Sequence, residues 1–359
     1  LSAIKDNVRT IRALQPTAEF MSVVKADAFG HGDIPVARAA LEAGATWFGV
    51  ARVSEGLRLR EAGITQPILA WLDDMAGLAE TAANANVDLA VSNLCELLAV
   101  SSVRHKVKIH LKLDTGLHRS GCSLDQWIAL VRAAARFEFE GTVVVRGIWS
   151  HLSHGAGSIA GNSERQLQLL RTGVAIARRA GLRPGLIHLA NTAGAANLDA
   201  PDLNLLRIGA GLYGIDETTI GLRPAMRLKA RITQVHQIKA GEGVSYGHDY
   251  VAAQDTTIGL VPLGYADGIP RLAGRKASVS CRGQRMPIVG RIAMDQFVIN
   301  AGETQIHLGD EVVIFGDGTQ GEPTALDWAE WACTIPHEIY CGISQRGPRR
   351  YLSPQVHAA

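Results

Sequence analysis

The most informative segment of the chain is Val23-Val24-Lys25-Ala26-Asp27-Ala28-Phe29-Gly30-His31-Gly32. The apolar run over residues 20–24 predicts a buried strand, which ends on a lysine and is followed by two glycines. Burial at such a strand end lowers the pKa of a lysine ammonium. A neutral amine is what Schiff-base chemistry with an aldehyde cofactor requires, so Lys25 is a candidate catalytic residue. The alternative is a lysine whose charge reaches solvent at the rim of the fold.

Around this segment, short apolar runs alternate with longer amphipathic stretches. The predicted strands cover residues 19–25, 45–51, 67–71, 87–91, 107–113, 142–150, 185–189 and 204–208. Helical patterns between them include residues 34–43, 53–62, 94–101, 124–137 and 162–180. Eight alternations of strand and helix predict a (β/α)₈ barrel of the TIM type, with a doubly wound open sheet as the main alternative.

Past Gly214 the pattern changes to short runs separated by Gly, Asp and Asn clusters. These runs cover residues 230–238, 257–262, 276–281, 286–289, 296–299 and 311–315. Such spacing with little helical periodicity predicts a C-terminal, mostly-β domain. We place the barrel at residues 1–222 and the β domain at residues 223–359.

Composition excludes several classes of protein. The chain has 359 residues, 47% of them hydrophobic and 19% charged, which is typical of a globular enzyme. Its net charge of +2, without basic blocks, argues against nucleic-acid binding. Five scattered cysteines without metal-ligand spacing predict free thiols, no metal site and a cytoplasmic location. No run is apolar for the roughly 18 residues of a membrane span. The chain opens already in helical periodicity, so a strand, signal or anchor could precede it.

Polar residues and glycines follow the predicted strands with unusual consistency. In a barrel, the carboxyl ends of the strands form the active face. The residues there are Lys25, Lys112, Arg119, His151, Asn191, Thr192, Arg207, Gly209 and Ala210. The loops after the seventh and eighth strands suit a phosphate group, because they offer a hydroxyl and backbone N–H groups. A lysine, a phosphate loop and carboxylate-binding arginines together predict pyridoxal 5'-phosphate and an amino-acid substrate.

The chain resembles the alanine racemase family, within the fold-type III pyridoxal-phosphate enzymes, from residue 7 to residue 351. The matching motifs are residues 23–32, Lys112-Leu-Asp-Thr-Gly-Leu-His-Arg119, Arg207-Ile-Gly, Leu212-Tyr-Gly, Val244-Ser-Tyr-Gly247, Gly264-Tyr-Ala-Asp-Gly268, Gly290-Arg-Ile-Ala-Met-Asp-Gln296 and Arg346-Gly-Pro-Arg349. The resemblance implies a barrel followed by a β domain, and a homodimer whose active sites take residues from both subunits. It also implies an isomerase that supplies D-alanine for peptidoglycan.

The resemblance assigns roles to individual residues. Lys25 and Tyr246, the latter from the partner subunit, would be the two catalytic bases. The cofactor would be bound by Lys25, Phe29, His151, Asn191, Thr192, Arg207, Gly209 and Ala210. The substrate would be bound or enclosed by Arg119, Tyr265, Met294 and His337. Lys112 matches a lysine that often carries a carbamate, and an ordinary ion-paired lysine is the alternative.

Racemisation explains why two bases are needed. A proton must leave one face of the substrate and return on the other, so two acid–base groups should flank the cofactor. A tyrosine has a pKa near 10 and needs nearby cations to act as a base, which the His151–Arg207 pair would supply through a hydrogen bond to Tyr246. Arg207 matches the residue facing the pyridine nitrogen. Because an arginine does not give up its proton, that nitrogen would stay unprotonated.

Four residues depart from the family pattern. One is Ala156, at an entry position that is often an aspartate. Asp27 replaces an asparagine, and Phe29 replaces a tyrosine that hydrogen-bonds the phosphate. His337 replaces a tyrosine over the substrate methyl group, so serine or another small polar amino acid is an alternative substrate. A metal-dependent relative using His337 and Cys341 is a further alternative. A non-enzymatic pyridoxal-phosphate carrier is disfavoured, because such proteins lack the β domain with its tyrosine.

Overall fold

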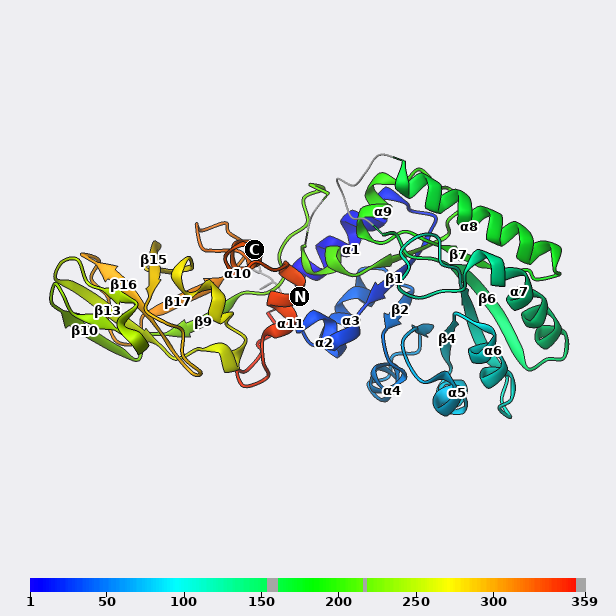
Figure 1. Cartoon of the computed structure of the whole chain (residues 1–359), viewed down its shortest axis with the longest axis horizontal. Helices are drawn as coiled ribbons and strands as arrows, with labels where there is room; N and C mark the ends of the chain where they lie inside the picture. The colour runs from blue at the N-terminus through cyan, green and yellow to red at the C-terminus, as the bar shows by residue number, and fades with distance from the viewer. Residues whose placement is uncertain (154–160, 216–217, 353–359) are drawn as a thin grey trace, which may run out of the picture. The chain divides into compact units, whose positions relative to one another are not determined.

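The computed structural model describes residues 1–153, 161–215 and 218–352 (Figure 1), so Ala156 lies outside the described residues. The chain divides into two compact units. The first comprises Leu1–Ala28 with Gly32–Leu222, and the second comprises Phe29–His31 with Arg223–Ala359. In the described ranges no helix is both long enough and apolar enough to cross a membrane.

The first unit is an eight-stranded parallel barrel. Its strands are β1 (Glu19–Val23), β2 (Trp47–Val50), β3 (Ile68–Ala70), β4 (Val87–Val91), β5 (Val107–Lys112), β6 (Val143–Trp149), β7 (Leu186–His188) and β8 (Leu205–Ile208). They are hydrogen-bonded in the order β7-β6-β5-β4-β3-β2-β1-β8. The two ends of this order meet, because Asn204 N–H donates to Ile187 O (3.1 Å) and Arg207 N–H donates to Ala190 O (3.0 Å). The sheet is therefore closed, as the alternation of strand and helix predicts.

Helices cover the outside of these strands (Figure 1). They are α1 (Ser2–Leu14), α3 (Asp33–Glu42), α4 (Val53–Glu61), α5 (Met75–Asn84), α6 (Leu94–Ser101), α7 (Leu124–Phe139), α8 (Asn162–Arg179) and α9 (Thr192–Asn197), with a 3₁₀ turn η1 (Ala210–Tyr213) after β8. On α7, the residues at helical spacing, Trp127, Leu130, Val131 and Ala134, are all buried. Their apolar stripe fixes the face that α7 turns to the strands.

The interior of the barrel combines an apolar cluster with polar side chains from β4, β5, β7 and β8. The apolar cluster contains Met21, Trp47, Leu69, Ala90, Trp149 and Leu205. Alternation along β5 places His110 and Lys112, two residues apart, on one face. Gly147 on β6 makes room for His110, since a Cβ at this glycine would collide with the imidazole ring. This polar interior supports the site at the carboxyl ends of the strands.

The second unit is built on an antiparallel sheet. Its seven strands follow the order β10-β13-β16-β15-β14-β17-β9, and β11 pairs with β12 in a separate hairpin. The strands are β9 (Leu228–Arg231), β10 (Gln234–Ile238), β11 (Gly243–Val244), β12 (Tyr250–Val251), β13 (Thr256–Val261), β14 (Ser278–Cys281), β15 (Gln284–Val289), β16 (Phe297–Gly302) and β17 (Glu311–Phe315). Two helices, α10 (Ala325–Ala332) and α11 (Pro336–Gly342), follow the sheet. The predicted fold class, a TIM-type barrel followed by a mostly-β domain, is confirmed.

One predicted strand is divided in the structure. Residues 230–238 were expected to form a single strand, but β9 pairs with β17 and β10 pairs with β13. The change of partner falls between them, where Ile232 N–H donates to Asp310 O (3.0 Å) and Thr233 N–H donates to Leu260 O (2.9 Å). Hydrophobic periodicity continues through this point, so it does not reveal a change of partner.

Candidate active site

The chain makes a left-handed turn directly after Lys25. Ala26, Asp27 and Ala28 have φ/ψ angles of 53°/51°, 52°/45° and 53°/51°, and Phe29 has a φ of 54°. This conformation costs roughly 1–2 kcal/mol for each residue with a side chain. Contacts with the rest of the barrel must therefore hold the turn in place.

Glu55 on α4 supplies the main contact. Its Oε1 accepts the N–H of Ala26 (2.7 Å), and its Oε2 accepts the N–H groups of Ala51 (2.8 Å) and Arg52 (3.0 Å). One carboxylate thus ties the residue after Lys25 to the loop after β2. Hydrogen bonds to a charged acceptor are stronger than those between neutral groups.

Asp27 departs from the family pattern, and its carboxylate makes contacts that stabilise the same turn. It accepts the N–H of Asp33 (3.0 Å) and lies 3.7 Å from the guanidinium of Arg58. Arg58 also forms a hydrogen-bonded ion pair with Asp33. Both carboxylates are therefore compensated by one cation on α4, and the turn gains a second anchor.

Arg207 projects from β8 into the barrel and is buried, with 4% of its surface exposed. Its Nη2 donates to Ser150 O (2.7 Å), Leu189 O (3.1 Å) and His151 Nδ1 (3.3 Å), and its Nη1 donates to His188 Nδ1 (3.1 Å). Burial lowers the pKa of Arg207 to about 9. The guanidinium still carries its charge at neutral pH, held by four acceptors.

His151 follows β6 and is surrounded by positive charge. Burial, followed by the charges of Arg207, Arg119, Lys112 and Lys25, lowers the pKa of His151 to about 3. The imidazole is therefore neutral at pH 7. Because Arg207 donates to Nδ1, the ring proton lies on Nε2, which makes Nε2–H a hydrogen-bond donor.

Lys112 ends β5 in the same group of cations. Its Nζ lies 4.5 Å from the centre of the Trp149 ring and donates to the hydroxyl of Ser120. Burial, with the charges of Arg207 and Arg119, lowers the pKa of Lys112 to about 8. A substantial fraction of this amine is neutral in mildly alkaline solution and is then able to react with carbon dioxide.

The loops predicted to bind phosphate lie next to each other. The hydroxyl of Thr192 accepts the N–H of Gly211 (3.0 Å), which follows Gly209 and Ala210 after β8. A Cβ on Gly211 would collide with the Thr192 side chain, so this close approach requires glycine. The Oδ1 of Asn191 caps α9 by accepting the N–H of its third residue (2.9 Å). The Thr192 hydroxyl retains its proton for donation, which fits a phosphate acceptor.

Gln166 on α8 positions the segment that carries His151. Its Nε2 donates to His151 O (3.0 Å) and Thr115 Oγ1 (3.0 Å), and its Oε1 accepts the N–H of Ser153 (2.9 Å). Thr115 in turn hydrogen-bonds the hydroxyl of Ser150 (2.8 Å). This buried network fixes the backbone on both sides of His151.

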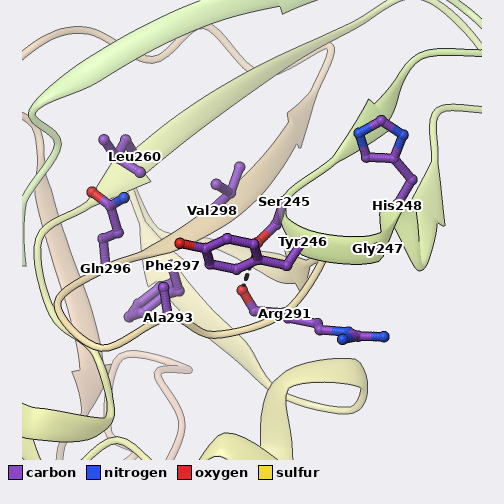
Figure 2. Close-up of a pocket in the computed structure, with 10 residues that line it drawn as sticks. All are labelled: Ser245, Tyr246, Gly247, His248, Leu260, Arg291, Ala293, Gln296, Phe297 and Val298. Atoms are coloured by element: carbon purple, nitrogen blue, oxygen red, sulfur yellow. Dashed lines mark hydrogen bonds between the residues drawn. The ribbon is translucent and has the colours of Figure 1, made fainter.

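In the second unit, Tyr246 lies in a constrained turn at the edge of a pocket (Figure 2). Its neighbours Ser245, Gly247 and His248 have positive φ angles of 63°, 74° and 50°. With a ψ of −171°, Ser245 occupies a region that is essentially reserved for glycine. Its hydroxyl donates to Arg291 O (2.9 Å). Figure 2 shows the Tyr246 ring directed toward Gln296 and the Arg291 guanidinium directed the opposite way.

Two further predicted residues of the second unit lie beside this pocket. Ala293, which lines it, accepts the N–H of Tyr265 (3.1 Å), and Met294 O accepts the N–H of Ala266 (2.9 Å). The exposed fractions are 73% for Tyr246, 44% for Tyr265 and 54% for Met294. Large hydrophobic side chains exposed together are typical of a surface that binds something else.

Phe29 and His337, both departures from the family pattern, are neighbours. Phe29 belongs to the second unit, and the two rings lie 5.6 Å apart between centroids at an angle of 44°. His337 is on α11, so its segment is helical. The two departures therefore occur at one place in the fold.

The structure brings most of the predicted residues into two groups. The barrel unit assembles Lys25, Lys112, Arg119, His151 and Arg207 around one another. The second unit gathers Tyr246, Tyr265 and Met294. Two family models match the chain, "Alanine racemase, N-terminal domain" over residues 1–217 and "Alanine racemase, C-terminal domain" over residues 225–351.

The chain belongs to the alanine racemase family. It is 43% identical to the alanine racemase of Salinispora arenicola over 361 residues, covering 98% of this chain and 96% of that protein. The crystal structure of alanine racemase from D-cycloserine-producing Streptomyces lavendulae superposes with a TM-score of 0.94 at 43% identity, covering 98% of this chain and 95% of the other. The alanine racemase of Streptomyces coelicolor A3(2) matches with the same TM-score and identity.

Sequence reasoning missed the residues that support these family positions. His110, His188 and Asp88 form a buried chain behind Arg207, and Glu55 anchors the lysine turn. The alternation of β5 was the available signal, because His110 and Lys112 share one face of the strand. No local sequence pattern indicates the role of Glu55, because its hydrogen-bond partners lie in two separate loops.

Proposed function

We propose that this chain interconverts L-alanine and D-alanine, using pyridoxal 5'-phosphate, with Lys25 and Tyr246 as the two acid–base groups. The observation that carries the proposal is the cluster of Lys25, Lys112, Arg119 and Arg207 around the neutral imidazole of His151. Membership of the alanine racemase family supports this assignment and alanine as the substrate. The relatives give no support to the serine alternative.

The residues of the barrel fit the proposed cofactor. Bound pyridoxal phosphate would supply an electron-withdrawing ring that stabilises negative charge on the substrate α carbon. Thr192, Gly209 and Ala210 would hold the phosphate, while the positive guanidinium of Arg207 would face the pyridine nitrogen and keep it unprotonated. Asn191 would contribute through the helix it caps. The Phe29 side chain is a hydrocarbon ring, so it would not replace the phosphate hydrogen bond of the family's tyrosine.

The proton transfers would use groups on opposite faces of the substrate. Lys25 Nζ would take or return the α proton on one face, and Tyr246 Oη would do so on the other. His151 presents Nε2–H as a donor because Arg207 occupies Nδ1. A hydrogen bond from this donor to Tyr246 Oη would stabilise the phenolate form of the tyrosine.

Substrate binding would use the remaining predicted residues. Arg119 would pair with the substrate carboxylate, and the Met294 N–H would add a second hydrogen bond. Tyr265 and His337 would enclose the substrate side chain. We also propose that Lys112 carries a carbamate, which would supply Arg119 with a negative partner; its lowered pKa supports this modification.

The proposed assembly is a homodimer in which Tyr246 acts in the active site of the partner subunit. The exposure of Tyr246, Tyr265 and Met294 in the single chain supports this arrangement. A cytoplasmic location belongs to the same proposal, supported by five free cysteines, all within the described residues.

A racemisation assay over L-alanine and L-serine tests the function. We expect alanine to be the better substrate, and we expect the purified protein to show the absorbance of a bound cofactor. Tyr246→Phe should keep this absorbance and lose racemisation by roughly 10²–10⁴-fold, the contribution of a general acid–base group. A protein without bound cofactor, or full racemisation by Tyr246→Phe, would contradict the proposal.

A further inference from the structure

A chain of buried hydrogen bonds runs from Arg207 through the interior of the barrel. Arg207 Nη1 lies 3.1 Å from His188 Nδ1, and His188 Nε2 lies 2.9 Å from His110 Nδ1. His110 Nε2 lies 3.3 Å from Asp88 Oδ2, which is also 3.3 Å from Arg146 Nη1. His188, His110 and Asp88 are fully buried. None of these three has a role in the function proposed above.

The direction of each hydrogen bond follows from its neighbours. A guanidinium only donates, so His188 Nδ1 accepts and the proton of this neutral ring lies on Nε2. His188 is neutral because burial, Arg207 and His110 lower its pKa well below the usual value. His188 Nε2–H then donates to His110 Nδ1, which leaves the His110 proton on Nε2. That proton needs an acceptor, and Asp88 supplies it.

Packing holds both rings in the orientation that these bonds require. The ring of His188 stacks on Trp149, with centroids 5.6 Å apart and planes 3° from parallel. His110 meets Trp47 edge to face at 5.5 Å. Gly147 lies so close to the His110 ring that a Cβ there would collide with it. Neither ring is free to turn its nitrogens elsewhere.

We propose that Asp88 is a positioning residue for Arg207, acting through His110 and His188 to keep the lone pair of His188 Nδ1 directed at the guanidinium. The catalytic part of this inference rests on the proposed function of Arg207. If Asp88 offered no acceptor, the His110 Nε2–H would be buried without one. The two imidazoles would then no longer both carry their proton on Nε2. A proton on His188 Nδ1 would point at the guanidinium of Arg207 and repel it.

Two substitutions at Asp88 distinguish the loss of its hydrogen-bond acceptor from the loss of its negative charge. Oδ1 of Asp88 has no hydrogen-bond partner among the described residues, and both contacts are made by Oδ2. Asp88→Asn can therefore place its amide nitrogen at Oδ1 and keep an acceptor for His110. Asp88→Leu removes the acceptor. Leu89→Ala, at a fully buried position on the same strand, is a control that leaves a cavity outside the chain of bonds.

The direct measurement is the ¹⁵N NMR spectrum of the imidazoles in the full chain labelled with [¹⁵N]histidine, with and without pyridoxal phosphate. The chain has 12 histidines, so the signals of His110 and His188 are assigned by single replacement of each. We expect both rings to be neutral, with the proton on Nε2, in the wild type and in Asp88→Asn. In Asp88→Leu we expect mixed tautomers.

Racemisation kinetics supply the second readout. We expect Asp88→Leu to lower kcat roughly 10- to 100-fold, by analogy with the loss found when the hydrogen-bond partner of a metal-binding histidine is removed, with KM for alanine nearly unchanged. Asp88→Asn and Leu89→Ala should stay within about threefold of wild type. A proton on His188 Nδ1 in the wild type overturns the proposal, even if the protein racemises nothing. So does an Asp88→Leu variant with unchanged signals and kcat, or an Asp88→Asn variant that behaves like Asp88→Leu.

Discussion

Replacing Glu55 by glutamine tests how the turn after Lys25 is held. The Glu55 carboxylate accepts three backbone N–H groups, from Ala26, Ala51 and Arg52. A glutamine has one acceptor oxygen, so its NH₂ group must face at least one of these donors. A hydrogen bond to a charged acceptor contributes about 1.5–3 kcal/mol. We therefore expect Glu55→Gln to lower the free energy of unfolding by about 1.5–3 kcal/mol.

This loss should appear in two measurements. A change of 1 kcal/mol shifts Tm by about 2–4 °C in a unit of this size, so Tm should fall by roughly 3–12 °C. Affinity for pyridoxal phosphate, measured by absorbance titration, should fall as well, because the left-handed turn that positions Lys25 relaxes. The matched control is Glu61→Gln, an exposed residue at the end of the same helix α4. Equal Tm and equal cofactor affinity for the two variants would refute this reasoning.

Three further predictions concern other parts of the site. Ser245→Ala removes the hydrogen bond to Arg291 O, so we expect a lower kcat with unchanged cofactor affinity; a kcat equal to wild type would show that this bond does not hold Tyr246. The pKa of His151 is about 3 in the folded protein and about 6.5 in the unfolded chain. The unfolded chain therefore binds more protons in this range, and the free energy of unfolding should fall as pH drops from about 6.5 toward 3. In urea unfolding, His151→Gln should show a shallower pH dependence, and an unchanged slope would contradict the assignment. Gly147→Ala should cost about 1–3 kcal/mol by crowding His110. Gly185→Ala, whose Cβ would meet only Arg146 O at an ordinary van der Waals distance of 4.0 Å, should leave Tm almost unchanged.

The positions of polar residues at strand ends were predictable, because parallel strands in a barrel all deliver their carboxyl ends to one face. His151 and Arg207 lie where that rule places them, and they are in direct contact. The His110–His188 contact was not predictable in the same way. It joins two strands that are not neighbours in the sheet, and its formation depends on the space left by Gly147.

The conformation around Lys25 shows a different limit of sequence reasoning. Ala26 and Ala28 have no intrinsic preference for positive φ, and in the sequence only the glycines indicated a turn. The left-handed path is imposed by distant partners, Glu55 above all. The same turn leads Phe29–His31 into the second unit, where Phe29 meets His337. No periodicity in residues 23–32 indicates that contact.

The claim that each active site combines two subunits is tested most directly by mixing two inactive variants, Lys25→Ala and Tyr246→Phe. After subunit exchange, half of the dimers are mixed, and each mixed dimer contains one site with both Lys25 and Tyr246 intact. Racemisation should therefore return to about a quarter of the wild-type rate. A mixture that exchanges subunits and stays as inactive as either variant alone would contradict the shared site.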